Sequence, residues 1–212
     1  MIKLDKRLSS ILNEIEGTVL ADIGCDHGKL TISALVNGKC QKAIAGDISA
    51  DSLNKTISLV KELGFEDKVE CRVSDGFENI HEDLDTAVIA GLGGYEIKDI
   101  LSKPFPQIKR FILCPHQNVM IARRAINQIG YGALKDYVVK EGKKYYQIIV
   151  AEKDLPLYDI NELRFGKNEP ESDDYYQMLK DRKAVLENRF LGKEIPKGEM
   201  QDEYQEIIRC LK

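Results

Sequence analysis

The chain has 212 residues and a formal net charge of −4, and 43% of its residues are hydrophobic. This length and hydrophobic content predict a folded α/β domain with an appendage and exclude an intrinsically disordered chain. The mild negative charge gives no overall attraction to nucleic acid, so an RNA partner would have to be held by a local basic surface.

The sequence contains no membrane-spanning or metal-binding pattern. No apolar run is long enough to cross a bilayer, and the charged segment 1–10 has no signal-peptide core. The five cysteines are scattered, without the C-x-x-C pair typical of zinc or redox sites. They are Cys25, Cys40, Cys71, Cys114 and Cys210. We therefore expect a cytoplasmic protein with no membrane partner and no metal.

Short segments rich in Val, Ile and Ala alternate with segments of helical period, which is typical of a parallel sheet covered on both faces. The expected strands are 18–23, 42–47, 69–73, 86–90, 110–114, 133–139 and 145–151. The expected early helices are 9–15, 30–36 and 49–63. The turn sequence 141–144 joins the last two strands into an antiparallel hairpin. Five parallel strands followed by a hairpin is the order of the Rossmann-like class I methyltransferase sheet.

After Pro156 the strand pattern ends, the charge rises, and two amphipathic helices flank residues 192–198. Their apolar stripes are Tyr175, Leu179, Leu186 and Phe190, and Met200, Tyr204, Ile207, Ile208 and Leu211. We expect these helices to pack on each other and on the main domain, or to grip a large substrate. The predicted domains are a catalytic domain, 1–154, and a small helical hairpin domain, 155–212.

The first predicted strand ends in D-I-G-C-D-H-G, residues 22–28, directly before a helix. Glycines at such a strand exit let the backbone approach a nucleotide cofactor, and the helix start offers free N–H donors. Nicotinamide enzymes carry G-x-G-x-x-G for a pyrophosphate, whereas this turn places carboxylates at Asp22 and Asp26, which would repel one. Two acids suit a cofactor that carries an ammonium or sulfonium charge, so we predict S-adenosylmethionine.

Acids also end the second and third strands. Asp47 can accept hydrogen bonds from both ribose hydroxyls, while Ser49 can cap the following helix in its place. Asp75 occupies a position that commonly faces the adenine amino group in this fold. The predicted cofactor-binding residues are Arg7, Asp22, Gly24, Cys25, Asp26, His27, Asp47, Ile48, Ser74, Asp75, Gly76, Gly91 and Leu92.

The fourth strand exits as A-G-L-G-G, residues 90–94, where glycines either clear the place of methyl transfer or make a tight turn with close helix packing. The N-P-P-Y-like motif of many amino-methylating enzymes is absent. A ring nitrogen such as adenine N1 already presents its lone pair, so positioning and electrostatics can supply most of the catalysis. The residues predicted to frame the acceptor are Gly93, Gly94, Cys114, Pro115 and His116.

Basic residues are spread along the chain, and we interpret most of them as solvated surface. If several converge at the carboxyl edge of the sheet, they would supply phosphate contacts for RNA. They are Lys3, Lys6, Arg7, Lys109, Arg110, Arg123, Arg124, Lys135, Lys140, Lys143 and Lys144.

The chain resembles the bacterial tRNA (adenine-22-N1)-methyltransferase family, TrmK, nearly from end to end. The matching segments are Lys6-Arg7-Leu8, D-I-G-C-D-H at 22–27, A-I-A-G-D at 43–47, A-G-L-G-G at 90–94, Y-Q-I-I-V at 146–150 and Arg164-Phe165-Gly166. The resemblance implies a Rossmann-like catalytic domain, a helical C-terminal domain, and methyl transfer from S-adenosylmethionine to an adenine N1 in the tRNA D-arm region. Because the methylated ring gains positive charge, Asp26 is the predicted catalytic carboxylate. The expected protein is a monomer.

The sequence departs from the family pattern at two places, with Cys114-Pro115-His116 in place of Gln-Pro-Asn and Leu92 in place of Met. The first departure lies near the expected substrate pocket and leaves other acceptors open, either another RNA site or a small molecule. An S-adenosylmethionine-binding RNA-interaction module with little catalysis is a further alternative. A nicotinamide oxidoreductase is disfavoured by Asp26 and by the terminal hairpin.

Overall fold

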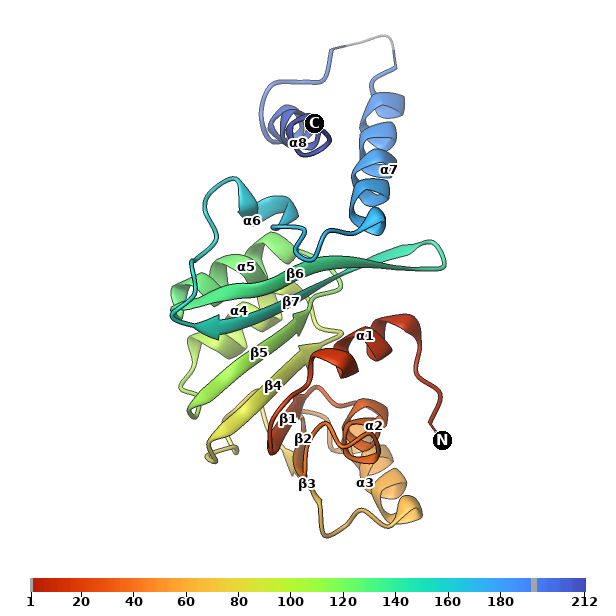
Figure 1. The fold of residues 1–212 in the computed structure, drawn as a ribbon, viewed down its shortest axis with the longest axis vertical. Helices are drawn as coiled ribbons and strands as arrows, with labels where there is room; N and C mark the ends of the chain where they lie inside the picture. The colour runs from red at the N-terminus through yellow and green to blue at the C-terminus, as the bar shows by residue number, and fades with distance from the viewer. Residues whose placement is uncertain (1, 192–193) are drawn as a thin grey trace.

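The computed structural model describes residues 2–191 and 194–212. A seven-stranded sheet lies at its centre and has the order β3-β2-β1-β4-β5-β7-β6 (Figure 1). The strands are β1 (Val19–Ile23), β2 (Lys42–Asp47), β3 (Val69–Val73), β4 (Leu84–Ala90), β5 (Ile108–Cys114), β6 (Tyr131–Glu141) and β7 (Lys144–Lys153). All seven expected strands are confirmed, with ends that differ by no more than two residues.

The first five strands are parallel and the last two form the expected antiparallel hairpin. Leu20 of β1 pairs with Ala43 of β2, and Ala87 of β4 pairs with Phe111 of β5. β7 then inserts between β5 and β6 and runs antiparallel to both, with Ala151 opposite Phe111. The sheet is therefore the predicted methyltransferase sheet rather than an all-parallel dinucleotide fold.

Helices cover both faces of the sheet (Figure 1). The helices are α1 (Lys6–Glu14), α2 (Lys29–Val36), α3 (Ala50–Leu63), α4 (Gly94–Ser102), α5 (Val119–Gln128), α6 (Glu162–Phe165), α7 (Asp173–Arg189) and α8 (Glu199–Cys210). α1, α2 and α3 bury Ile11, Ile32 and Val60 against one face, while α4 and α5 bury Ile97 and Ile126 against the other. Both faces of the sheet are thus removed from water, which explains its nearly continuous apolar strands.

The first helix begins earlier than the expected range 9–15, at Lys6. Asp5 lies directly before it, and its side chain accepts a 2.7 Å hydrogen bond from the Leu8 backbone N–H. An aspartate in this position satisfies one of the free N–H groups of the first turn, so the helix can start there. This start also brings Arg7 into the first turn of α1.

The two C-terminal helices pack on each other and on β6. Tyr175, Leu179 and Leu186 of α7 form a buried cluster with Ile207 of α8 and Val138 of β6. The expectation that the apolar stripes pack together and on the main domain is confirmed. Within the described ranges, no helix is long and apolar enough to span a membrane.

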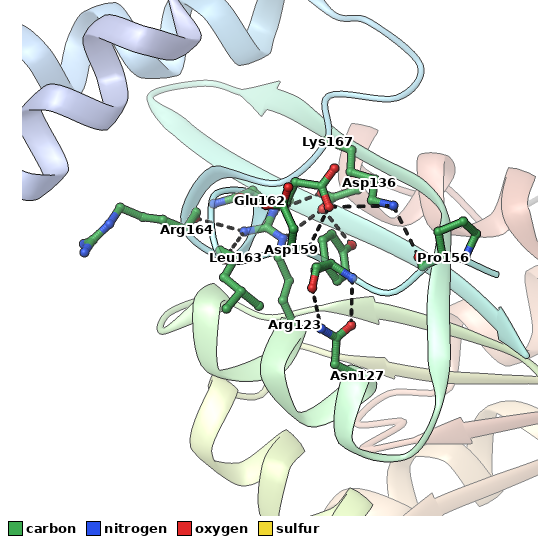
Figure 2. Close-up of polar contacts among 11 residues, drawn as sticks. Arg123, Asn127, Asp136, Pro156, Asp159, Glu162, Leu163, Arg164 and Lys167 are labelled. Carbon is green, nitrogen blue, oxygen red and sulfur yellow. Dashed lines mark hydrogen bonds and ion pairs between the residues drawn. The ribbon is translucent and has the colours of Figure 1, made fainter. Parts of the chain in front are cut away.

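A buried arginine joins the sheet to the segment that leads into these helices (Figure 2). Arg123 of α5 has no solvent-exposed surface and pairs with Asp136 of β6 at 2.8 Å. Its other N–H groups donate to the Gln147 side chain at 2.6 Å and to the backbone oxygens of Leu163 and Arg164 at 3.2 and 2.9 Å. All five guanidinium N–H donors are therefore satisfied. Arg123 is thus an exception to the expectation that most of the basic residues are solvated surface, and its partners come from strands and turns distant in the sequence.

Two further residues complete this junction. Tyr158 lies on the segment after β7, and its hydroxyl donates a 2.7 Å hydrogen bond to Asp136 of β6. Gly166 follows α6 in a left-handed conformation, φ 82°, and a side chain there would collide with Asp136 and Arg123. Glycine is therefore required where α6 ends against the buried ion pair, which explains the glycine of the Arg164-Phe165-Gly166 segment.

Candidate active site

A cavity of about 970 Å³ opens at the carboxyl ends of β1, β2, β3 and β4. Strand order reverses between β1 and β4, and in open α/β sheets ligands bind at such a switch point. All thirteen residues predicted to bind the cofactor line this cavity: Arg7, Asp22, Gly24, Cys25, Asp26, His27, Asp47, Ile48, Ser74, Asp75, Gly76, Gly91 and Leu92. The structure thus brings together side chains that are up to 85 positions apart in the sequence.

The turn after β1 is held in place by β2 and α3. The backbone N–H groups of Gly24 and Cys25 both donate to the Gly46 carbonyl oxygen, at 2.8 and 3.1 Å. Thr56, buried on α3, donates from its hydroxyl to the Asp26 carbonyl oxygen at 2.9 Å. The backbone of Asp26 is left-handed, with φ 47°, and its side chain is 65% exposed. The turn therefore presents the Asp26 carboxylate outward from a fixed backbone.

Asp22 lies at the floor of the cavity and is only 4% exposed. Its carboxylate accepts a 2.6 Å hydrogen bond from the Thr31 hydroxyl on α2. Burial raises the pKa of Asp22 to about 6, although the Thr31 hydrogen bonds oppose the shift. Asp22 is consequently ionised near neutral pH but takes up a proton under mildly acidic conditions.

Asp47 and Ser49 are the two residues that the sequence offered as the cap of α3, and Asp47 was also predicted to bind the cofactor. Ser49 caps α3 by accepting a 3.2 Å hydrogen bond from the Ser52 backbone N–H. Asp47 accepts hydrogen bonds from the backbone N–H groups of Ser49, at 2.8 Å, and of Asp26, at 3.3 Å. These two donors orient the Asp47 carboxylate at the cavity wall, and it does not serve as the helix cap.

Two basic side chains reach the cavity from elements outside the predicted strand ends. Lys103, at the end of α4, forms ion pairs with Asp75 and, at 3.3 Å, with Glu78. Arg7, in the first turn of α1, lies over the Tyr146 ring with 5.4 Å between its Cζ and the ring centre. Asp75 therefore faces a lysine as well as the cavity, a pairing that the sequence did not indicate.

α4 contributes polar residues to the cavity wall that were not among the predicted site residues. Glu96, Asp99, Ser102 and Lys103 line it from this helix, and Lys29 lines it from α2. The apolar spacing of Ile97, Ile100 and Leu101 is a helical signal that would have located α4. Which polar residues of that helix face the cavity depends on how it packs on the sheet.

The residues predicted to frame the acceptor lie outside the cavity wall: Gly93, Gly94, Cys114, Pro115 and His116. His116 contacts the cavity rim. Its backbone N–H donates to the Leu92 carbonyl oxygen at 3.0 Å, and its Nδ1 lies 2.9 Å from the Gly91 carbonyl oxygen. The loop after β5 is thereby held against the glycine-rich exit of β4.

Close packing explains Gly94 without a direct role in methyl transfer. A Cβ atom at Gly94 would collide with the Asn118 carbonyl oxygen, since α4 starts tightly against the loop after β5. Cys114 is 1% exposed, and burial raises its pKa to about 11. A buried neutral thiol is not a nucleophile, so Cys114 has a packing role rather than a catalytic one.

The charge of the cavity wall fits a cationic cofactor. Six carboxylates line it, against three basic side chains. The carboxylates are Asp22, Asp26, Asp47, Asp75, Glu96 and Asp99, and the basic residues are Arg7, Lys29 and Lys103. An excess of acids attracts a sulfonium or ammonium group and repels a pyrophosphate. The volume is also within the range that holds a nucleoside-sized ligand.

Comparisons with known proteins agree with this arrangement. Residues 4–149 match the model of a methyltransferase domain. Over 156 residues, 71% of this chain, the sequence is 33% identical to the tRNA (adenine(22)-N(1))-methyltransferase of Bacillus subtilis. Because the domain model matches more than half of its length, the chain belongs to this methyltransferase domain family. The aligned part is 66% of the B. subtilis enzyme, slightly under two thirds of its length.

Solved structures of this methyltransferase family superpose over nearly the whole chain. Mycoplasma capricolum TrmK, solved with the cofactor product S-adenosyl-homocysteine, has a TM-score of 0.87 at 25% identity, covering 98% of this chain and 97% of its own. Streptococcus pneumoniae Sp1610, a putative tRNA (m1A22) methyltransferase, has a TM-score of 0.90 at 25% identity, covering 99% and 100%. The superpositions extend over the helices after β7, so the family fold includes α6, α7 and α8.

Proposed function

We propose that this protein transfers the methyl group of S-adenosylmethionine to N1 of adenine 22 in tRNA. The observation that carries the proposal is the acid-lined cavity at the switch point of a methyltransferase sheet, in a chain that belongs to the family. Relatives of this chain are named for this reaction, and the M. capricolum relative was solved with the product of this cofactor.

The cavity residues have distinct proposed roles in holding the cofactor. Asp47 is oriented by two backbone donors and accepts hydrogen bonds from the ribose hydroxyls. Ile48, which is exposed beside it, offers an apolar surface to the adenine. Asp75 lies at the adenine end, and Asp22 and Asp26 supply negative charge at the first turn. The remaining proposed contacts are Arg7, Gly24, Cys25, His27, Ser74, Gly76, Gly91 and Leu92.

When bound, S-adenosylmethionine supplies an electrophilic methyl group on a positively charged sulfur. Adenine N1 attacks the methyl carbon with its own lone pair, the bond between sulfur and that carbon breaks, and S-adenosylhomocysteine leaves, so no residue has to remove a proton first. The exit of β4 offers backbone and no side chain at Gly91, where no atom lies within 4 Å of an added Cβ, which leaves room for a flat base. As the ring becomes positive, the exposed Asp26 carboxylate stabilises the developing charge. His116, held against the Gly91 carbonyl oxygen, borders the opening on the proposed acceptor side.

N1 lies on the pairing edge of adenine, so the target base in the D-arm region has to leave its contacts and turn into the cavity. We place the catalytic domain at residues 1–154 and a helical domain at 155–212. We propose that the protein acts as a monomer. We also propose a cytoplasmic location, since that is where a tRNA substrate would be met.

Methyl transfer from labelled S-adenosylmethionine to unmodified tRNA transcripts tests the proposal. Two transcripts differ only at position 22, adenine in one and guanine in the other, and total bacterial RNA is a third acceptor. Label in the adenine transcript alone, recovered as N1-methyladenosine after digestion, is the expected result. Label only in other RNA would assign a different target. Cofactor binding without any transfer would favour the RNA-interaction module.

A further inference from the structure

A second cavity, of about 410 Å³, lies where α5, α6 and α8 meet, outside the cofactor cavity. We call it the arginine cleft, because Arg124 of α5, Arg164 of α6 and Arg209 of α8 all line it. These three residues are far apart in the sequence and converge only through the docking of the C-terminal helices. Two carboxylates, Asp202 and Glu206, also line the cleft.

Glu206 holds two of the arginines side by side. Its Oε2 accepts a 3.0 Å hydrogen bond from Arg164 Nε, and its Oε1 lies 3.5 Å from Arg209 Nη2. Arg209 Nη2 also donates to the Asn161 carbonyl oxygen at 3.1 Å. One carboxylate is thus shared by two guanidinium groups, each of which keeps N–H donors for another acceptor. The side chain of Arg209 is 49% exposed.

Arg124 completes the set from the catalytic domain. It is exposed, and within residues 2–191 and 194–212 it forms no ion pair with a carboxylate. Of the other acids near the cleft, Asp202 is exposed in the first turn of α8, and Glu199 lies 3.9 Å from Arg164. The lining of the cleft thus holds three arginines and two carboxylates, and Arg124 is the arginine that has no carboxylate partner among the described residues.

The walls of the cleft are fixed by the buried network of Figure 2. Arg123, next to Arg124 on α5, binds the backbone oxygens of Leu163 and Arg164 and so ties α6 to α5. In Figure 2 the Arg164 side chain extends away from that network, on the other side of α6. Its backbone is therefore anchored while its guanidinium remains in the cleft. Preorganised donors lose little freedom when they bind an anion.

The cleft also lies on a route from the cofactor cavity. α5 starts at Val119, directly after the loop that holds His116 against the rim of that cavity. Arg124 is five residues further on, about 8 Å along the helix axis at 1.5 Å per residue. α5 therefore connects the loop at the cavity rim with the lining of the cleft.

We infer that the arginine cleft binds a backbone phosphate of the tRNA, in the strand that flanks the target adenine. Guanidinium groups match the oxygens of a phosphate with paired N–H donors, and three of them converge here. This inference rests on the proposed function and adds to it a contact that joins the helical region to the substrate. The phosphate contact positions the tRNA and carries no sequence information.

The test measures direct binding of an unmodified tRNA transcript to wild-type protein and to Arg124→Ala, Arg209→Ala and the double variant. We expect roughly threefold to tenfold weaker binding for each single variant and a salt dependence of log Kd that is less steep by about one. The affinity for S-adenosylmethionine and the turnover at saturating tRNA stay at the wild-type level. Asp202→Asn, which removes a negative charge from the cleft, is expected to tighten tRNA binding.

Arg189→Ala is the matched control, because Arg189 is an exposed arginine at the end of α7, outside the cleft. Equal effects of Arg189→Ala and Arg124→Ala would show only a general charge effect and overturn the inference. Wild-type affinity of the double variant would also overturn it, as would inorganic phosphate binding to the cleft without competing with tRNA. A failed transfer to adenine 22 by wild-type protein would instead remove the proposed function, independently of the binding result.

Discussion

The Thr31 hydroxyl on α2 donates a 2.6 Å hydrogen bond to the Asp22 carboxylate, and both residues are buried beneath the cofactor cavity. This bond gives the carboxylate one donor in a site where water has been removed. One bond does not offset the loss of solvation, because burial still raises the pKa of Asp22 to about 6. The stability of the protein and its affinity for a cation should therefore both depend on this residue.

Asp22 is expected to make the folded state less stable as pH rises from about 4 to about 6. Its pKa is higher in the folded state than the ordinary value of 3.8, so the folded state binds the proton more tightly in that window. The loss amounts to about 3 kcal/mol and is complete above pH 6. Urea unfolding at several pH values should show this dependence in wild-type protein and not in Asp22→Asn. Exposed Asp67→Asn is the control, and an identical pH profile for wild type and Asp22→Asn would contradict the assignment.

The same titration is expected to weaken cofactor binding in acid. Below pH 6 the Asp22 carboxyl takes up its proton, and the cavity loses one negative charge next to a cationic ligand. Calorimetric titration with S-adenosylmethionine should give a Kd that rises as pH falls from 7 to 5. Asp22→Asn should bind S-adenosylmethionine weakly at both pH 7 and pH 5. If the Kd of this variant still changed with pH, another group would be responsible for the effect.

Asp47 and Ser49 should separate ligand binding from helix capping. Asp47→Asn is expected to weaken S-adenosylmethionine binding roughly tenfold, because the charged acceptor for the ribose is lost. Ser49→Ala removes the cap of α3 and should lower the free energy of unfolding by about 1 kcal/mol with little change in cofactor affinity. Calorimetry and urea unfolding of both variants check this. Equal effects on affinity would show that Asp47 acts only through the fold.

Asp26→Asn should reduce the rate of methyl transfer by a larger factor than it weakens cofactor binding. The carboxylate is expected to stabilise the positive charge that develops on the adenine ring. We expect kcat to fall roughly tenfold, which corresponds to about 1.4 kcal/mol of activation free energy. Asparagine tolerates the left-handed backbone at this position, φ 47°, so the turn should persist. Single-turnover rates with the adenine-22 transcript provide the measurement. Unchanged turnover would exclude this role for Asp26.

Gly94 and Gly91 should respond differently to alanine. At Gly94 the added methyl group collides with the Asn118 backbone, so we expect a loss of about 2 kcal/mol and a lower Tm, with cofactor affinity retained. At Gly91 no atom lies within 4 Å of the added Cβ, but the residue lines the cavity. Gly91→Ala should weaken cofactor binding or lower turnover. The left-handed backbone at this position should also lower the Tm, but by less than in Gly94→Ala. The opposite pattern would mean that Gly94 lies at the transfer site.

Much of the cofactor site could be predicted because its residues follow strand ends. The carboxyl ends of parallel strands meet at one edge of a sheet, so Asp22, Asp47 and Asp75 had to lie near one another once their strands were recognised. The cap at Ser49 was also predictable, since a cap depends only on residues within a few positions. The acceptor side was less predictable, because Cys114 follows a strand in the same way but points into the core.

The sequence by itself determined the strands, their parallel order with a terminal hairpin, and the acids of the cofactor turn, because these depend on local periodicity and on residues close in the chain. Only the tertiary structure decided that Arg123 is buried, that Lys103 pairs with Asp75, and that Arg124 and Arg209 share one cleft. Each of these relationships joins residues on different elements. Their geometry is set by how whole helices dock on the sheet, through apolar contacts that no short window of sequence contains.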